Sequence, residues 1–318
     1  MTTAGMVFRT LILPGFLLLF VLAFLWEWLD RKFVARLQKR HGPLYTGPAG
    51  ILQPVADLIK LLAKEDIEPT EADKLFFRAT PVVLLALPLA GLFFVPMATG
   101  TGLAHFQGDL ILVLFVFTLL VITTFYAGWA SADRFSIVGV MRSTIQMLAY
   151  EVPLALAVMG PALAARSLSI GDIVQWQVAN GRWLIWSQPL GFAVALISLM
   201  AELEVAPFDS PEAETEIVAG WQTEFSGRKL ALIRLGEDMG LVLASSLLVA
   251  LYLGGPHGPV PGLGLLWFLI KAVAVVFLFS NLRAVFARFR IDQMVDWCWK
   301  YLVPAGIGQI MLTELLLA

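Results

Sequence analysis

The chain has 318 residues, of which 59% are hydrophobic and only 14% are charged, and its formal net charge is −2. A soluble globular domain carries about 25% charged residues, so this composition excludes an ordinary water-soluble domain and indicates a protein of the lipid bilayer. The near-neutral charge gives no electrostatic basis for binding nucleic acid, and we expect no nucleic-acid partner.

Residues that bind redox cofactors are scarce. Cys298 is the single cysteine, which excludes an internal disulfide and the four-cysteine ligation of an iron–sulfur cluster. The histidines His41, His105 and His257 lie far apart, without the spacing of metal ligands. We therefore expect that this chain binds no metal and no redox cofactor, and that any redox centre working with it lies on a partner subunit.

Apolar runs of roughly 20 residues, the length that crosses a hydrocarbon core of ~30 Å, recur along the chain. They number eight and lie at 8–28, 80–98, 109–130, 145–164, 185–203, 239–254, 262–281 and 298–317. The first run ends in charged and aromatic residues and has no small-residue cleavage site, so we interpret it as a retained span. The sequence predicts an all-α, polytopic membrane protein that forms one integral-membrane domain over residues 1–318.

Basic residues alternate between the connections. Most of them lie in segments 29–79, 131–144, 204–238 and 282–297, whereas the other connections hold only Arg166 and Arg182. By the positive-inside rule the four basic segments face the cytoplasm. Both chain ends then face the opposite side, as eight crossings require, and we expect a location in a prokaryotic cytoplasmic membrane.

The first cytoplasmic segment, 29–79, contains an amphipathic stretch. Apolar residues recur at helical spacing over 51–62, with polar residues between them. This pattern predicts a helix that lies at the membrane surface or packs on other spans, and both interpretations can hold together.

The acidic segment, 202–224, leads into the acidic cytoplasmic loop 204–238. Before the first basic residue, Arg228, it holds seven carboxylates: Glu202, Glu204, Asp209, Glu212, Glu214, Glu216 and Glu224. Crowded carboxylates titrate as coupled groups, which suits proton transfer. The alternative is a solvated acidic loop, but the apolar and aromatic residues between the acids favour a packed segment.

Local signals refine this picture. Ser210 and Pro211 are typical of a helix start, which would place Glu212 and Glu216 on one face, four residues apart. Glu151 lies near the start of the fourth span, and Arg142 lies in the segment before that span. Glu151 is therefore either an ion-paired group leading into the membrane or an interfacial glutamate. Lys271, inside the seventh span, is expected to pair with an acid or to contact a partner subunit.

Motifs spread over residues 27–300 together resemble one family. They include Asp-Arg-Lys-Phe-Val-Ala-Arg-Leu-Gln at 30–38, Gln-Met-Leu-Ala-Tyr-Glu-Val-Pro at 146–153, Pro-Phe-Asp at 207–209, Glu-Ile-Val-Ala-Gly at 216–220, Glu-Phe-Ser-Gly at 224–227 and Arg-Ile-Asp-Gln at 290–293. As a set they resemble complex I subunit 1, a membrane component of NADH-quinone oxidoreductases. The family includes the homologous membrane component of membrane-bound [NiFe]-hydrogenases and ferredoxin-linked complexes.

The resemblance implies a protein at the junction between a peripheral redox arm and an ion-pumping arm. The implied partners are homologues of the iron–sulfur-cluster subunit and of the large subunit of the peripheral arm, antiporter-like membrane subunits and small membrane subunits. Iron–sulfur clusters, with a NiFe centre or a flavin, would be on those partners. Matching positions give a proton path of Arg142, Glu151, Glu202, Asp209, Glu212, Glu214, Glu216 and Glu224, to which the crowding of the acids adds Glu204. They also give a redox-arm junction or quinone-like cavity of Arg36, Gln38, Arg40, Asp57 and Lys60, together with Asp30, which stands where the family usually carries a glutamate.

Some positions depart from the pattern of respiratory members. Leu44 and Tyr45 stand where those members usually carry Asn-Arg, and Val205 stands near a position that is usually polar or basic. We therefore expect a hydrogenase or ferredoxin-linked complex that pumps H⁺ or Na⁺ and need not bind quinone. A quinone-reducing respiratory dehydrogenase is the alternative. A secondary transporter, which would show repeated halves, and a purely structural anchor are further alternatives.

Overall fold

The structure is a computed structural model that describes residues 15–260 and 262–317. These residues form helices and no strand. In chain order the elements are α2 (Phe16–Leu37), η1 (Pro48–Gly50), α3 (Gln53–Ala63), α4 (Lys74–Leu92), α5 (Asp109–Ala130), α6 (Arg134–Ala165), α7 (Ile170–Ala179), α8 (Leu184–Ser187), α9 (Pro189–Glu202), η2 (Ser210–Glu212), α10 (Glu214–Ile217), η3 (Gly220–Gln222), α11 (Gly227–Tyr252), α12 (Gly264–Val285), α13 (Ile291–Trp297), η4 (Cys298–Leu302) and α14 (Val303–Leu317).

Each of the eight predicted spans coincides with a helix. By length and composition α4, α5, α6, α11 and α12 can cross a membrane, and α9 is a shorter apolar helix. Helix α2 carries charges in its second half, and α14 is short because η4 and α13 precede it. Residues 8–14 of the first predicted span lie outside the described residues. The all-α, polytopic class is confirmed.

Several helices begin earlier than hydropathy predicts. Helix α4 begins at Lys74 rather than 80, α6 at Arg134 rather than 145, and α11 at Gly227 rather than 239. The Asp73 and Asp133 carboxylates cap α4 and α6 by accepting backbone N–H groups from Leu75 (3.1 Å) and Phe135 (2.8 Å). Hydropathy marks only the apolar part of a helix, and these helices continue into the basic connecting segments.

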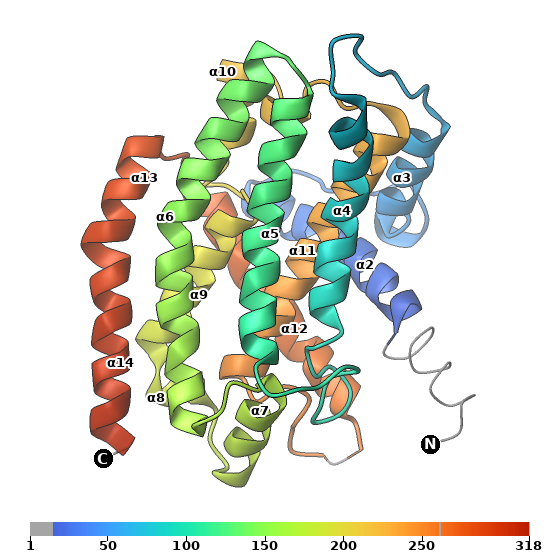
Figure 1. Cartoon of the computed structure of the whole chain (residues 1–318). Coiled ribbons are helices and arrows are strands. Elements are labelled where there is room, and N and C mark those ends of the chain that lie inside the picture. The colour runs from blue at the N-terminus through green and yellow to red at the C-terminus, as the bar shows by residue number, and fades with distance from the viewer. Residues whose placement is uncertain (1–14, 261, 318) are drawn as a thin grey trace.

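Helix α11 is the central helix of the bundle. It packs against α4 and α2, while α6 packs against α5, α9 and α14 (Figure 1). In its apolar stretch 83% of the residues are buried, against 39% in α4 and in α12. A Cβ on Gly236 would lie 2.8 Å from the Leu84 carbonyl oxygen, so a glycine allows α11 and α4 to approach closely.

Helix α3 is the predicted amphipathic helix. It packs against α11 and α2, which confirms the packed interpretation. Its Ile59 and Leu62 side chains are exposed, so contact of this edge with the membrane surface stays a prediction.

Among the described residues Lys271 pairs with carbonyl oxygens and with no acid. Its Nζ donates to the carbonyl oxygens of Leu253 (2.6 Å), Gly255 (2.9 Å) and His257 (2.6 Å) and lies 4.7 Å from the centre of the Trp183 ring. The carbonyls at the end of a helix carry partial negative charge, so the buried ammonium is satisfied by the chain that follows α11.

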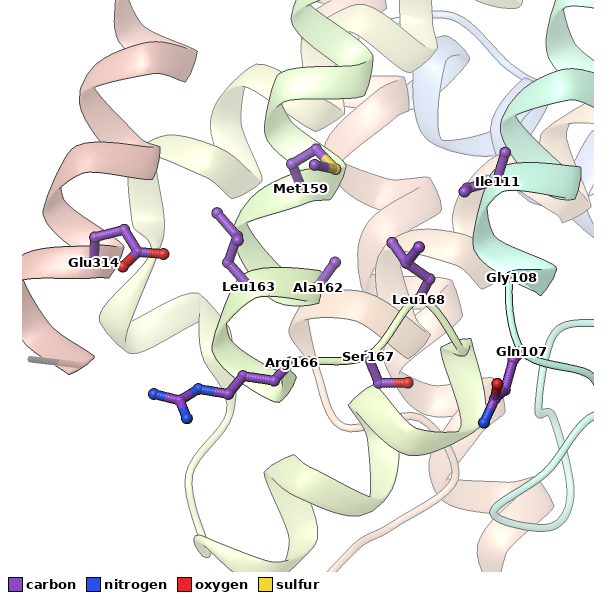
Figure 2. Close-up of a pocket in the computed structure, with 10 residues that line it drawn as sticks. All are labelled: Gln107, Gly108, Ile111, Met159, Ala162, Leu163, Arg166, Ser167, Leu168 and Glu314. Carbon is purple, nitrogen blue, oxygen red and sulfur yellow. The ribbon is translucent and has the colours of Figure 1, made fainter.

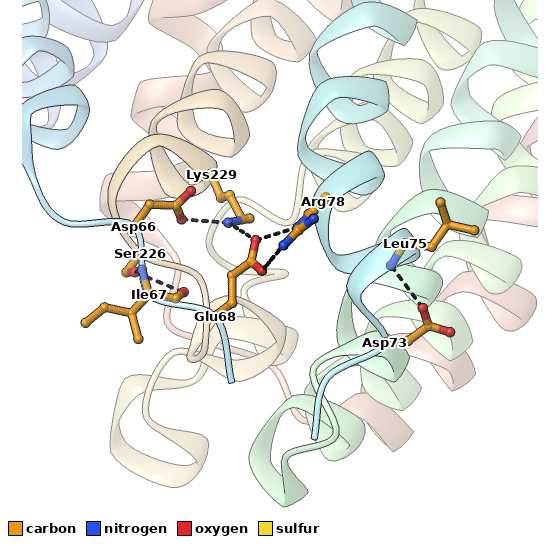
Figure 3. A network of polar contacts seen from close by, with 8 residues as sticks. All are labelled: Asp66, Ile67, Glu68, Asp73, Leu75, Arg78, Ser226 and Lys229. Carbon is orange, nitrogen blue, oxygen red and sulfur yellow. Dashed lines mark hydrogen bonds and ion pairs between the residues drawn. The ribbon is translucent and has the colours of Figure 1, made fainter. Parts of the chain in front are cut away.

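The first cytoplasmic segment is fastened to α4 and α11 by a polar network (Figure 3). The Glu68 carboxylate accepts from Arg78 Nε at 2.8 Å and from Lys229 Nζ at 2.8 Å, and Lys229 also donates to Asp66 at 2.7 Å. Gly227 has a φ of +53°, and a Cβ there would lie 2.6 Å from the Glu65 carbonyl oxygen. These contacts hold the first cytoplasmic segment against the end of the acidic segment.

This network predicts a pH-dependent stability. Hydrogen bonds from Arg78 and Lys229 hold the pKa of Glu68 at about 2, below its ordinary value of 4.5. A lowered carboxyl pKa stabilises the fold above pH 4.5, and that stabilisation is lost as the pH falls towards 2. We expect Glu68→Gln to lower the unfolding temperature of the detergent-solubilised protein at pH 6. Below pH 4.5 the unfolding temperature of the variant should fall less steeply than that of the wild-type protein.

Glu71→Gln is the control, because Glu71 is an exposed glutamate of the same segment. Equal unfolding temperatures for Glu68→Gln and Glu71→Gln at pH 6 would show that the network does not stabilise the fold.

Candidate functional site

A cavity of about 710 Å³ lies where the first cytoplasmic segment, the acidic segment and α11 meet. Its apolar lining includes Leu58, Leu61, Met147 and Phe279. Its charged lining consists of nine carboxylates and four arginines: Glu27, Asp30, Asp57, Glu202, Glu204, Asp209, Glu212, Glu237, Asp238, Arg31, Arg234, Arg283 and Arg288. We call it the acidic cavity; its volume is in the range of small-molecule sites.

The acidic cavity joins residues from both predicted groups. From the proposed proton path, Glu202, Glu204, Asp209 and Glu212 line it, and from the first cytoplasmic segment Asp30 and Asp57 line it. The remaining predicted residues are not in its lining: Arg36, Gln38, Arg40 and Lys60, which are exposed, and Arg142, Glu151, Glu216 and Glu224. The side chain of Glu214 lies outside the described part of the structure.

The acidic segment does not form the single helix that the sequence predicted from Ser210. It forms the short turn η2 and then α10, separated at Ala213, whose ψ of 90° is not helical. As a result Glu212 lines the acidic cavity, while Glu216 is 54% exposed on the surface and binds Arg142 at 2.6 Å. Gly220 makes the fold-back possible, because a Cβ there would lie 1.9 Å from the Pro211 carbonyl oxygen.

Glu204 is held by two donors. Ser143 Oγ donates to one carboxylate oxygen, and Trp221 Nε1 donates to the other at 3.2 Å. Burial disfavours the charged form more than these two bonds favour it, and it raises the pKa of Glu204 to about 7.

Glu212 also binds a proton near neutral pH. Burial is the largest cause, and the negative charges of Glu237 and Glu204 add to it, so that the pKa of Glu212 rises to about 8 despite the nearby Arg234. Gln222 Nε2 donates to Glu212 and, at 2.5 Å, to Glu237. Glu204 and Glu212 can therefore take up or release protons in the range where a cell works.

Other acids of the cavity are paired with arginine. Arg288 binds Asp209 through two bonds of 2.7 Å each, and Arg283 binds Asp30, which also accepts from Ser280 at 2.7 Å.

Asp57 belongs to the same paired set. It accepts from Arg31 at 2.8 Å and from Gln53 at 2.9 Å. Burial acts to raise the pKa of Asp57, but the bonds from Arg31 and Gln53 outweigh it and lower that pKa. The cavity thus combines carboxylates that arginines neutralise with carboxylates that protons neutralise.

Glu202 connects the cavity with the membrane interior. It is only 6% exposed, and its Oε1 has no hydrogen-bond partner among the described residues. It interacts electrostatically with Glu204 and with Glu151, which accepts a hydrogen bond from Thr118 on α5. The structure therefore brings Glu151 near Glu202 and away from Arg142, which binds Glu216 instead.

Sequence reasoning missed Glu237, Asp238 and Glu27 as site residues. Glu27 and Asp238 are hydrogen-bonded to each other, and Arg31 contacts both Glu27 and Asp57. The available signal was the pair of adjacent acids directly before the apolar run 239–254, since acids at such a position are expensive unless they face a cavity or a partner.

A larger cavity, of about 840 Å³, lies at the opposite end of the bundle, between the start of α5, the end of α6 and α14 (Figures 1 and 2). Its lining holds Arg166 and Glu314 but none of the predicted site residues. No group of three or more His, Cys, Asp or Glu residues arranged as a metal site occurs in 15–260 and 262–317. The acidic cavity is therefore the candidate site.

The two raised pKa values predict an infrared titration. In the purified protein, protonated-carboxyl absorption should be lost in two steps, near pH 7 and near pH 8. Glu204→Gln should remove the first step and Glu212→Gln the second. Glu216→Gln should leave both, because its carboxylate is exposed and paired with Arg142. Absence of any carboxyl loss between about pH 6 and 9 would contradict these assignments.

The chain is similar to known proteins over nearly its whole length. Residues 9–314 match the family described as NADH dehydrogenase. The chain is 41% identical over 323 residues to the H subunit of the NADH-quinone oxidoreductase of Thermomicrobium roseum, covering 95% of this chain and 94% of the relative. It is 40% identical over 309 residues to the H subunit of the Dehalococcoides mccartyi enzyme, covering 96% and 86%. The chain is a multi-pass membrane protein that belongs to the NADH dehydrogenase family, together with these components of NADH-quinone oxidoreductases.

Proposed function

We propose that this chain is the membrane subunit that couples electron transfer in a peripheral redox arm to ion translocation in a complex I-like oxidoreductase. The acidic cavity is the observation that carries the proposal. It joins the first cytoplasmic segment to Glu204 and Glu212, and through Glu202 it leads to Glu151 on α6. On its own the chain is expected to have no oxidoreductase activity.

The electrostatics are large enough for such coupling. A unit charge that appears about 8 Å away, at an effective dielectric constant of about 20, changes the energy of a carboxylate by roughly 2 kcal/mol. A pKa shift of one unit corresponds to about 1.4 kcal/mol. A charge change at the redox arm can therefore move Glu204 and Glu212 across neutral pH, since their pKa values are about 7 and about 8.

The next step follows from the arrangement of the acids. When Glu204 changes its charge, the repulsion on the buried Glu202 changes, because Glu204 acts on Glu202 directly. Glu212 interacts electrostatically with Glu204. Glu202 in turn interacts with Glu151. We propose that this sequence of acids passes the change to the ion-pumping partner subunits, which move H⁺ or Na⁺.

For the electron acceptor we propose quinone. The preference for a hydrogenase or ferredoxin-linked complex relied on Leu44, Tyr45 and Val205. Val205 lines the acidic cavity, but Leu44 and Tyr45 do not, and Tyr45 is 96% exposed. Arginines at four other positions do line it, and guanidinium groups are suitable donors for quinone carbonyl oxygens. The names of the relatives support the same acceptor.

The hydrogenase and ferredoxin-linked types are the competing proposal. Identification of the partner chains in the complex purified from the native membrane separates them. A nickel-binding large subunit would favour hydrogenase, and a nucleotide-binding flavoprotein together with bound quinone would favour the quinone type.

Exchange of single acids tests the coupling role. In the assembled complex reconstituted in vesicles, Glu212→Gln should lower the ion gradient formed per electron transferred by on the order of tenfold or more, as loss of a proton-transfer group does. Glu216→Gln is the matched control, because Glu216 lies on the surface four residues further along. Wild-type turnover together with a wild-type gradient in Glu212→Gln would refute the role.

A further inference from the structure

Gln222 lies between two acids that belong to different parts of the fold. It ends η3 and is only 3% exposed. Its Nε2 donates to Oε1 of Glu212 in the acidic segment and to Oε1 of Glu237 on α11. One buried amide therefore joins the acidic segment to the central helix.

The amide has unused bonding capacity on its other side. A glutamine side chain carries two N–H donors and one carbonyl acceptor. Both donors of Gln222 are used on carboxylates, whereas its Oε1 is buried without a hydrogen-bond partner among the residues that the structure describes. A buried acceptor of this kind is costly, so the site suits a donor that appears only under some conditions.

A protonated Glu212 is such a donor. When the Glu212 carboxylate takes up a proton, it becomes a hydroxyl donor and no longer needs the amide N–H. Rotation of the amide about its last bond turns Oε1 towards that hydroxyl and moves Nε2 away from Glu237. Glu237 then relies on Arg234, whose Nη1 donates to its Oε2 at 3.1 Å.

We propose that Gln222 is a positioning residue that transmits the protonation of Glu212 to Glu237 and thereby to α11. The charged groups that act on Glu212 are Glu237, Glu204, Asp209 and Arg234, and Asp238 lies beside Glu237 on α11. The other acids stay in place, because only the Gln222 amide turns. It then presents Oε1 to Glu212, where it presented Nε2 before. This inference rests on the proposed coupling function.

The pH at which Glu212 binds its proton tests the proposal. The amide N–H favours the ionised form, so Gln222→Met, which keeps the length of the side chain but removes the amide, should raise the midpoint of Glu212 by about one pH unit. The readout is the Glu212 carboxyl absorption in the infrared, identified by its loss in Glu212→Gln, in the purified assembled complex. The alkaline limit of gradient formation in vesicles should move in the same direction.

Gln177→Met is the matched control. Gln177 is 2% exposed and donates to the backbone carbonyls of Ala250 and Leu251 rather than to acids. Gln177→Met should leave the Glu212 midpoint unchanged. A general loss of packing would instead shift the midpoint in both variants. If Gln222→Met does not assemble, Gln222→Asn replaces it, because its amide is one methylene too short to contact both acids and the same upward shift is expected.

The outcomes separate this inference from the coupling function on which it rests. An unchanged Glu212 midpoint in an assembled Gln222 variant overturns the role of Gln222, even if Glu212→Gln abolishes the gradient. A shifted midpoint with wild-type gradients in both Gln222→Met and Glu212→Gln overturns the coupling function and leaves the amide contact with Glu212 in place.

Discussion

The structure depends on one constraint, the burial of many carboxylates where the connecting segments meet the membrane helices. Nine carboxylates share the acidic cavity with four arginines. An ionised carboxylate without a partner costs several kcal/mol in such surroundings. Ion pairs with arginines offset this cost for Asp30, Asp57 and Asp209. Proton binding offsets it for Glu204 and Glu212, because their pKa values lie near neutrality. The same constraint that stabilises the site thus makes it responsive to protons and nearby charge.

The surrounding fold keeps these groups together. Lys229 and Glu68 tie the first cytoplasmic segment to α11, and Gly227 lets the two backbones come close enough for those bonds. Gly220 folds the acidic segment back on Pro211, so that Glu212 lies in the cavity and Glu216 does not. Segments that are far apart in sequence therefore form a single site.

The sequence predicted the helices well and the site in part. Hydropathy is a local property, so each predicted span coincides with a described helix, but it could not show that α11 begins at Gly227 and carries Glu237 and Asp238 into the cavity. Glu202, Glu204, Asp209 and Glu212 were identified because they are crowded along the chain. The break at Ala213 was missed because it depends on Gly220 meeting Pro211, a contact that no local pattern encodes. Of the positions that depart from the respiratory pattern, Val205 lines the cavity and Leu44 and Tyr45 do not, a difference that no local pattern shows.

The most direct test of the account is proton uptake by the intact complex when its redox arm is reduced. A pH indicator in weakly buffered solution at about pH 7.5, between the pKa values of Glu204 and Glu212, would record it. The account predicts rapid proton uptake in the wild-type complex and its loss when both residues are replaced by glutamine, with electron entry into the redox arm unchanged. Proton uptake of wild-type size in that double variant would contradict it.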